Sequence, residues 1–122
     1  MIVVSFNYRV DLLSYFAHAA LSEEDPLNPT NFGLLDQRLA IEWVSKYISS
    51  FNGDPNRITV MGESAGAQSI VVHMQSWQEY KPKFHKAIIM SSYPLCTTIY
   101  LQQAEDIGKR FVKEVGCDFQ NK

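Results

Sequence analysis

The chain has 122 residues, of which 46% are hydrophobic and 20% charged, and its net charge is −2 at pH 7. A chain of this length has room for one small hydrophobic core. The balanced charge argues against a nucleic-acid partner, and the longest apolar runs, such as residues 1–4, are far short of the roughly 20 residues that span a bilayer.

The first predicted element is a strand over residues 2–8, where β-branched and aromatic residues dominate. We expect it to be buried on both faces. Residues 23–33 are rich in proline and asparagine and are predicted to form a loop, with Asn31 or Gly33 at the start of the next helix. That helix is predicted over residues 34–50.

The helix over residues 34–50 has apolar residues on two opposite sides of a helical wheel. A helix with two such faces needs two partners, and this chain offers little to cover the second one. The first face contains Leu34, Ile41, Val44 and Ile48, and the second contains Leu35, Leu39 and Trp43.

The rest of the chain alternates strands with helices. A turn cluster at residues 52–56 precedes a predicted strand over 57–61, a helix over 65–76 and a strand over 86–90. An amphipathic helix follows from Leu101, and Gly116 is placed to cap its end. Strands that alternate with helices of this length predict an α/β fold with a parallel sheet.

Residues 62–66 read Gly62-Glu63-Ser64-Ala65-Gly66, the Gly-x-Ser-x-Gly pattern of a nucleophile elbow, between a predicted strand and a predicted helix. In that role Ser64 is the catalytic nucleophile on a strained turn, and the glycines leave room where side chains would clash. The Ala65 amide, at the helix N-terminus, is the predicted oxyanion donor. Alternatively, Ser64 is an ordinary small residue in a strand-to-helix turn.

The chain resembles the cholinesterase-like carboxylesterases, a branch of the α/β-hydrolases that includes the crystal-protein esterases. The resemblance extends over nearly the whole chain, in blocks that follow one another at the family's spacing. Those blocks are NYR at 7–9, NFGLLDQ at 31–37 with Ala40 and Trp43, FNGDPNRIT at 51–59, GESAGA at 62–67 and FHKAI at 84–88.

The resemblance implies that Ser64 attacks an ester carbonyl and forms an acyl-enzyme that water then cleaves, without a metal or cofactor. It also implies that Glu63 is a structural carboxylate beneath the elbow and not the acid of a triad. The charged residues implied to belong to the framework are Arg9, Asp36, Asp54 and Arg57.

Ser64 also needs a base, and in this fold the histidine follows the serine in the chain. His73 lies about 13 Å along its helix from Ser64, and His85 precedes the strand over residues 86–90, at the opposite edge of the sheet. His18 comes before the serine. We therefore expect residues 1–122 to be part of a single α/β-hydrolase domain whose oxyanion loop precedes Met1 and whose acid and histidine follow Lys122.

The resemblance further implies that a strand absent from this chain lies between residues 2–8 and the strand before Ser64. Three positions depart from the family, which usually has glycine where this chain has Asp11, Ser14 and Ser92. Cys117 matches a cysteine whose partner lies further along the family's chain, and Cys96 is expected to be a free thiol.

The leading hypothesis is a carboxylic-ester hydrolase segment that is inactive, or nearly so, by itself. The rival is a noncatalytic relative, since cholinesterase-like domains also serve in cell adhesion, and a third possibility is a short product that folds alone and binds a partner. The acyl and alcohol groups of the ester stay open. The compartment stays open too, although the family favours a secretory or vesicular route.

Overall fold

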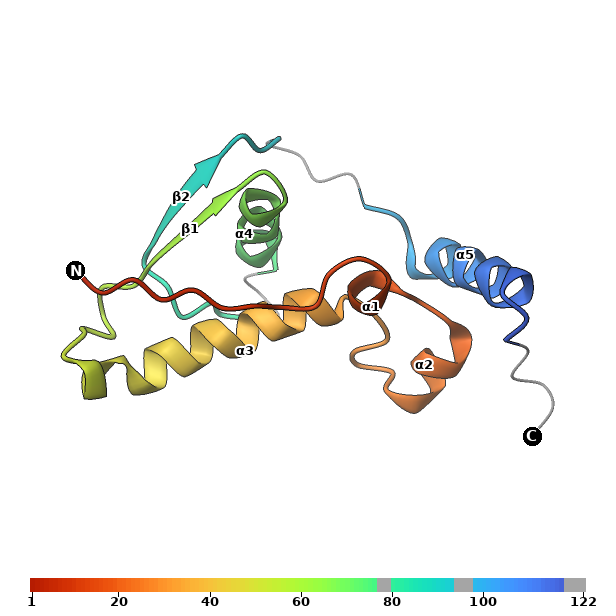
Figure 1. Ribbon diagram of the computed structural model, residues 1–122, viewed down its shortest axis with the longest axis horizontal. Coiled ribbons are helices and arrows are strands. Elements are labelled where there is room, and N and C mark those ends of the chain that lie inside the picture. The colour runs from red at the N-terminus through yellow and green to blue at the C-terminus, as the bar shows by residue number, and fades with distance from the viewer. Residues whose placement is uncertain (77–79, 94–97, 118–122) are drawn as a thin grey trace. The chain divides into compact units, whose positions relative to one another are not determined.

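The computed structural model describes residues 1–76, 80–93 and 98–117. The chain divides into two compact units (Figure 1). One unit consists of Met1–Tyr8 with Leu34–Thr97, and the other consists of Arg9–Gly33 with Thr98–Lys122. Within the described ranges, no helix has the length and apolar character needed to cross a membrane.

The first unit is built on two parallel strands, β1 (Thr59–Glu63) and β2 (Lys86–Met90), paired from Thr59 with Lys86 to Glu63 with Met90. Helix α4 (Ala65–Gln75) joins them and contacts both (Figure 1). The predicted parallel α/β arrangement is thus confirmed. β1 begins two residues later than predicted because the Arg57 N–H is used in a turn, donating to the Asp54 carbonyl.

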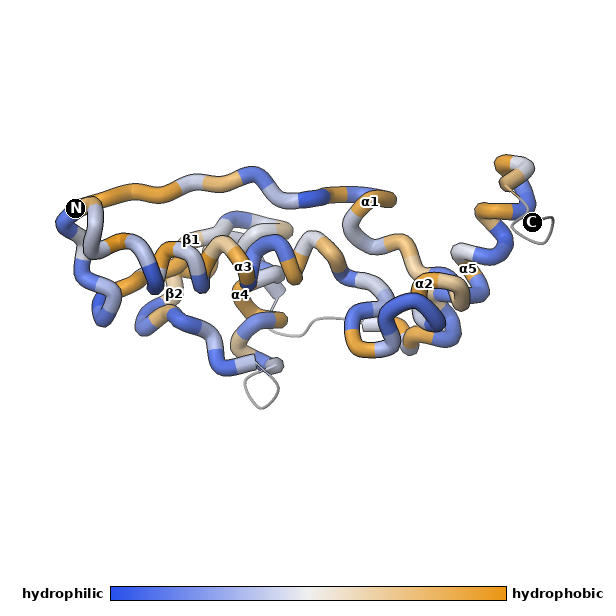
Figure 2. Tube along the Cα trace, turned by 90° about the horizontal axis from the view of Figure 1, so that it is seen from below, coloured by the Kyte–Doolittle hydropathy of each residue, from blue (hydrophilic) through white to orange (hydrophobic). Residues whose placement is uncertain are grey.

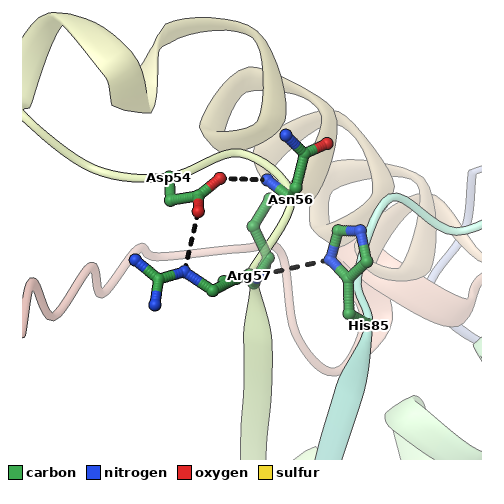
Figure 3. A network of polar contacts seen from close by, with 5 residues as sticks. Asp54, Asn56, Arg57 and His85 are labelled. Carbon is green, nitrogen blue, oxygen red and sulfur yellow. Dashed lines mark hydrogen bonds and ion pairs between the residues drawn. The ribbon is translucent and has the colours of Figure 1, made fainter.

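The polar residues before β1 and β2 hold the beginning of this sheet together (Figure 3). The Asp54 carboxylate accepts a hydrogen bond from the Asn56 N–H at 2.9 Å and pairs with the Arg57 guanidinium at 2.7 Å. The backbone N–H of His85 donates to the Ile58 carbonyl, and its Nδ1 accepts from the Ile58 N–H at 3.2 Å. Asp54, Arg57 and His85 therefore serve the framework at this end of the sheet.

Helix α3 (Phe32–Tyr47) continues into the 3-10 helix η1 (Ile48–Phe51). It begins directly after Asn31, whose φ is 62°, so the predicted start at this loop is confirmed. On the first predicted face Ile41 and Ile48 are buried by the described residues, whereas on the second Leu39 and Trp43 are exposed and Leu35 is half-buried. The exposed apolar surface continues to Tyr47 and Phe51, and the Trp43 ring contacts both of their rings.

The second unit contains α1 (Leu12–Tyr15), α2 (Ala19–Glu24) and α5 (Leu101–Glu114). A Cβ at Gly108 of α5 would lie 1.9 Å from the Ala17 carbonyl, so this close packing requires glycine. The end of α5 is the predicted glycine cap: Gly116 has φ 73°, its N–H donates to the Lys113 carbonyl, and the Cys117 N–H donates to the Val112 carbonyl. Cys117 is a free, exposed thiol, and Cys96 lies outside the described residues.

The predicted strand over residues 2–8 is not formed. In the part of the chain that the structure describes, β1 and β2 pair only with each other, and residues 2–8 have no ladder to join. The segment begins with an apolar run, orange beside the N label in Figure 2. The side chains of Ile2, Val3 and Val4 in this run are exposed. β-branched residues favour an extended backbone, but a strand also needs a neighbour for its N–H and C=O groups.

Two of the three positions at which the resemblance implies a glycine, Asp11 and Ser14, lie in the second unit. Asp11 has φ 57° and ψ −138°, in a region that favours glycine, and its side chain does not cap α1. Ser14 is fully buried, and its Oγ accepts a hydrogen bond from the Gly33 N–H at 3.0 Å. The serine thus adds a contact that glycine lacks, whereas the aspartate adds strain.

Replacement of Asp11 by glycine is expected to raise the free energy of unfolding of this chain by about 1 kcal/mol, because it relieves the positive φ without loss of a cap. Urea denaturation measures the change. Asn31→Gly is the matched control and is expected to change stability less, because asparagine tolerates its left-handed conformation. An equal gain in both variants, or a loss in Asp11→Gly, contradicts this account.

Candidate active site

Ser64 lies between β1 and α4, at the carboxyl end of the sheet, and its side chain is exposed. Its φ of 51° and ψ of −116° are unfavourable for any residue but glycine, and such a conformation costs on the order of 1–3 kcal/mol. The Ser64 N–H donates to the Met90 carbonyl at 3.0 Å, which ties the turn to the end of β2. The turn is therefore strained and held in place from the sheet.

The two glycines of the motif have different surroundings. A Cβ at Gly62 would lie 2.4 Å from the Gly66 carbonyl carbon and 2.7 Å from the Ala67 nitrogen. Because these are backbone atoms that cannot move aside, position 62 requires glycine, as predicted. At Gly66 the described residues leave open space within 4 Å. The expectation that a side chain at 66 would clash is therefore wrong for the described residues.

Ala65 and Glu63 flank the serine. Ala65 is the first residue of α4, and the first N–H groups of a helix have no acceptor within it. With the helix dipole, they favour a negative charge at this point. Glu63 ends β1 opposite Met90 and is exposed. The oxyanion role of Ala65 and the structural role of Glu63 stay predictions.

His73 is on the far part of α4 and is almost fully buried, with an exposed fraction of 1%. Its Nε2 lies 2.9 Å from Oε1 of Gln37 on α3. Burial, and then the positive charge of Arg38, lower the pKa of this histidine from 6.5 to about 4. The ring is thus a packed, neutral group, in agreement with the prediction that it is not the base for Ser64.

The other two histidines have backbone partners of their own. His85 caps the start of the ladder, at the end of the sheet away from Ser64. His18, in the second unit, is the N-cap of α2 and accepts a hydrogen bond from the Ala20 N–H.

Ser92, which follows β2, donates to the Gln68 side chain on α4 at 2.9 Å. A search of the described ranges finds no cluster of three metal-ligating side chains.

Sequence reasoning missed Gln37 and Ser69, two buried polar residues that connect α3 to α4. The Gln37 Nε2 donates to the Ser69 Oγ at 3.3 Å, and this hydroxyl donates to the Ala65 carbonyl at 2.9 Å. A signal was available, because Ser69 and His73 are spaced four residues apart and so share one face of α4. Polar residues on a buried stripe indicate a hydrogen-bonded network.

A strained, exposed serine between a parallel strand and a helix has the conformation expected at the nucleophile elbow of the α/β-hydrolases. A model of the carboxylesterase family matches residues 1–122, and the chain belongs to that family. It has part of the α/β-hydrolase fold of the solved esterases: a thermophilic PNB esterase superposes with a TM-score of 0.72 at 35% identity, over 90% of this chain and 22% of the esterase.

Relatives of this chain include two enzymes whose names give different ester substrates. The chain is 45% identical over 122 residues to fumonisin B1 esterase of Sphingopyxis macrogoltabida, with 97% of this chain and 21% of that protein covered. It is 39% identical to crystal protein of Dictyostelium discoideum (99% and 20% covered) and 40% identical to acetylcholinesterase of Electrophorus electricus (96% and 18%). The chain spans about a fifth of the length of these relatives.

Alanine substitutions at the two glycines are expected to differ in sign. Gly62→Ala forces a Cβ against backbone and is expected to destabilise the chain by about 2 kcal/mol or more. Gly66→Ala meets no clash in the described residues and adds a good helix former to α4, which is expected to stabilise by up to about 1 kcal/mol. Chemical denaturation of the two variants side by side measures both, and equal losses would show that Gly66 is as confined as Gly62.

The low pKa of His73 predicts acid sensitivity. Unfolded His73 takes up a proton near pH 6.5 but folded His73 only near pH 4, so its contribution to stability is complete above about pH 6.5 and is lost as the pH falls toward 4. Between pH 7 and 4.5 the loss is about 2 kcal/mol. Burial raises the pKa of the neighbouring Tyr80 to about 12, so its phenol does not titrate in this range.

Urea denaturation of the wild type and of His73→Gln at both pH values measures this loss. His73→Gln keeps a donor for Gln37 but has no group that titrates, so its stability is expected to fall by about 2 kcal/mol less than that of the wild type. Parallel pH dependence of the two proteins would contradict the assignment to His73.

Proposed function

We propose that this chain supplies the nucleophile segment of a serine carboxylic-ester hydrolase. The observation that carries the proposal is the conformation of Ser64, which is exposed, strained and positioned at the N-terminus of α4. Membership of the carboxylesterase family supports an ester as the substrate. The proposal extends to the whole protein the activity class that the names of its relatives indicate.

In the proposed reaction the Ser64 Oγ loses its proton to a base and forms a bond to the carbonyl carbon of the ester. The carbonyl oxygen becomes an oxyanion, which the Ala65 N–H stabilises with the positive end of the α4 dipole. Collapse of the intermediate breaks the bond to the alcohol oxygen, which takes the proton from the base, so that the alcohol leaves and the acyl group stays on Ser64. Water, deprotonated by the same base, then attacks the acyl carbon, and the carboxylic acid leaves as the serine regains its proton.

We infer that the base lies outside these 122 residues. His73 is buried and engaged with Gln37, while His85 is engaged with Ile58 at the opposite end of the sheet. The chain is proposed to be one part of a single α/β-hydrolase domain, with further residues supplying the histidine, the acid and the rest of the oxyanion hole. By itself it is proposed to be inactive or nearly so.

A fluorophosphonate probe, which reacts with activated serines, tests this function. The 122-residue chain and the longest product of the same gene that contains it are each treated with the probe, with ester hydrolysis measured in parallel. The longer product is expected to be labelled and to lose labelling in Ser64→Ala, while the 122-residue chain reacts at least about 1,000-fold more slowly.

Ser92→Ala is the matched control, because Ser92 follows β2 at the same edge of the sheet but its hydroxyl is engaged with Gln68. It is expected to keep most of the labelling. Labelling that survives in Ser64→Ala overturns the nucleophile assignment. A folded longer product that is never labelled favours a noncatalytic relative, and rapid labelling of the short chain would place the base within these residues.

A further inference from the structure

Four residues of the first unit form a continuous series of hydrogen bonds from the last turn of α4, by way of α3, back to the first turn of α4. His73 Nε2 lies 2.9 Å from the Gln37 Oε1, the Gln37 Nε2 lies 3.3 Å from the Ser69 Oγ, and this oxygen lies 2.9 Å from the Ala65 carbonyl oxygen. His73, Gln37 and Ser69 are all buried, with exposed fractions of 1%, 5% and 7%. These hydrogen bonds are therefore largely protected from exchange with water.

One atom sets the direction of every hydrogen bond in this chain. The Ala65 carbonyl oxygen can only accept a hydrogen bond, so the Ser69 hydroxyl must donate its one proton to it. Toward Gln37 the same hydroxyl can then act only as an acceptor. Gln37 must then turn its amide nitrogen toward Ser69 and its oxygen toward His73. His73 must in turn carry its proton on Nε2, which leaves Nδ1 buried without a hydrogen-bond partner among the described residues.

We propose that Gln37 and Ser69 are positioning residues for the nucleophile elbow: through the Ala65 carbonyl they fix the first turn of α4, on which Ser64 and the Ala65 N–H depend. The inference rests on the proposed function of Ser64. A strained residue keeps its conformation only when its surroundings hold it on both sides. The sheet holds Ser64 through the Met90 carbonyl, and the Gln37–Ser69 pair holds the helix side.

If Ser69 only attached α4 to α3, a hydrogen bond between these helices far from Ser64 would serve the same purpose. A second pair, in which the Arg38 guanidinium donates to the Ser76 Oγ at 2.9 Å, also joins α3 to α4, but at the opposite end of α4. Ser69 and Ser76 both bond a side chain of α3, but Ser69 lies near the elbow and Ser76 is the C-cap of α4, eleven residues beyond Ala65. Replacing each in turn therefore separates positioning of the elbow from attachment of α4 to α3.

The experiment uses the longest product of the gene that contains these residues. Ser69→Ala is expected to slow fluorophosphonate labelling of Ser64 about tenfold and to lower kcat for p-nitrophenyl acetate with little change in KM. Ser76→Ala is expected to stay within about twofold of the wild type. Ser69→Thr, which keeps the hydroxyl, is expected to recover most of the rate. Thermal unfolding of each variant gives the folded fraction by which the rates are corrected.

Equal slowing in Ser69→Ala and Ser76→Ala after that correction overturns the positioning role, because it would mean that both serines only attach α4 to α3. The failure of the proposed function is a separate outcome, seen as labelling that persists in Ser64→Ala. In that case nitrogen-15 NMR still decides the proposal.

In the NMR measurement His73 is expected to show a protonated Nε2 and a bare Nδ1. The amide signals of Ala65 and Gly66 are expected to move in Ser69→Ala but not in Ser76→Ala. Unmoved signals in Ser69→Ala overturn the role of this hydroxyl in the first turn of α4.

Discussion

The parallel pairing of β1 with β2 is the constraint on which the elbow depends. It brings the Met90 carbonyl opposite the end of β1, where that carbonyl accepts the Ser64 N–H. This hydrogen bond is one of the contacts that hold Ser64 at its unfavourable φ of 51°. The pairing is secured at its other end by His85, whose ring and backbone both bond Ile58, so the two ends of a five-residue ladder are fixed by different chemistry.

The strained turn at Ser64 is supported by two kinds of contact. At Gly62 the absence of a side chain leaves room for the backbone of Gly66 and Ala67. Near the start of α4, Ser69 and Gln37 form hydrogen bonds that end at the Ala65 carbonyl. Ser64, the proposed nucleophile, makes no side-chain hydrogen bond to the cap of α4, which leaves its hydroxyl available for the proposed chemistry. Structural support and reactivity are therefore assigned to different residues.

Local patterns predicted the elements whose stability is local. The helix that follows Ser64 and the glycine cap of α5 depend on residues near one another in the sequence, and the structure confirms both. The strand over residues 86–90 is confirmed too, because its ladder partner β1 lies within this chain. The strand over residues 2–8 was wrong because a ladder depends on a partner elsewhere. The polar chain was missed for the same reason, since Gln37 and His73 are 36 residues apart and meet only when α3 packs on α4.

The hydrogen bond from Ser69 to Ala65 also has an electronic consequence. The Ala65 carbonyl is conjugated with the nitrogen of Gly66, so a proton donated to that oxygen draws electron density from the Gly66 N–H. His73, Gln37 and Ser69 donate in one direction, so their bond dipoles add along the chain. The peptide group between Ala65 and Gly66, in the first turn of α4, is consequently more polarised than an isolated one, and the positive end of the helix is strengthened at the Gly66 N–H, two residues after Ser64.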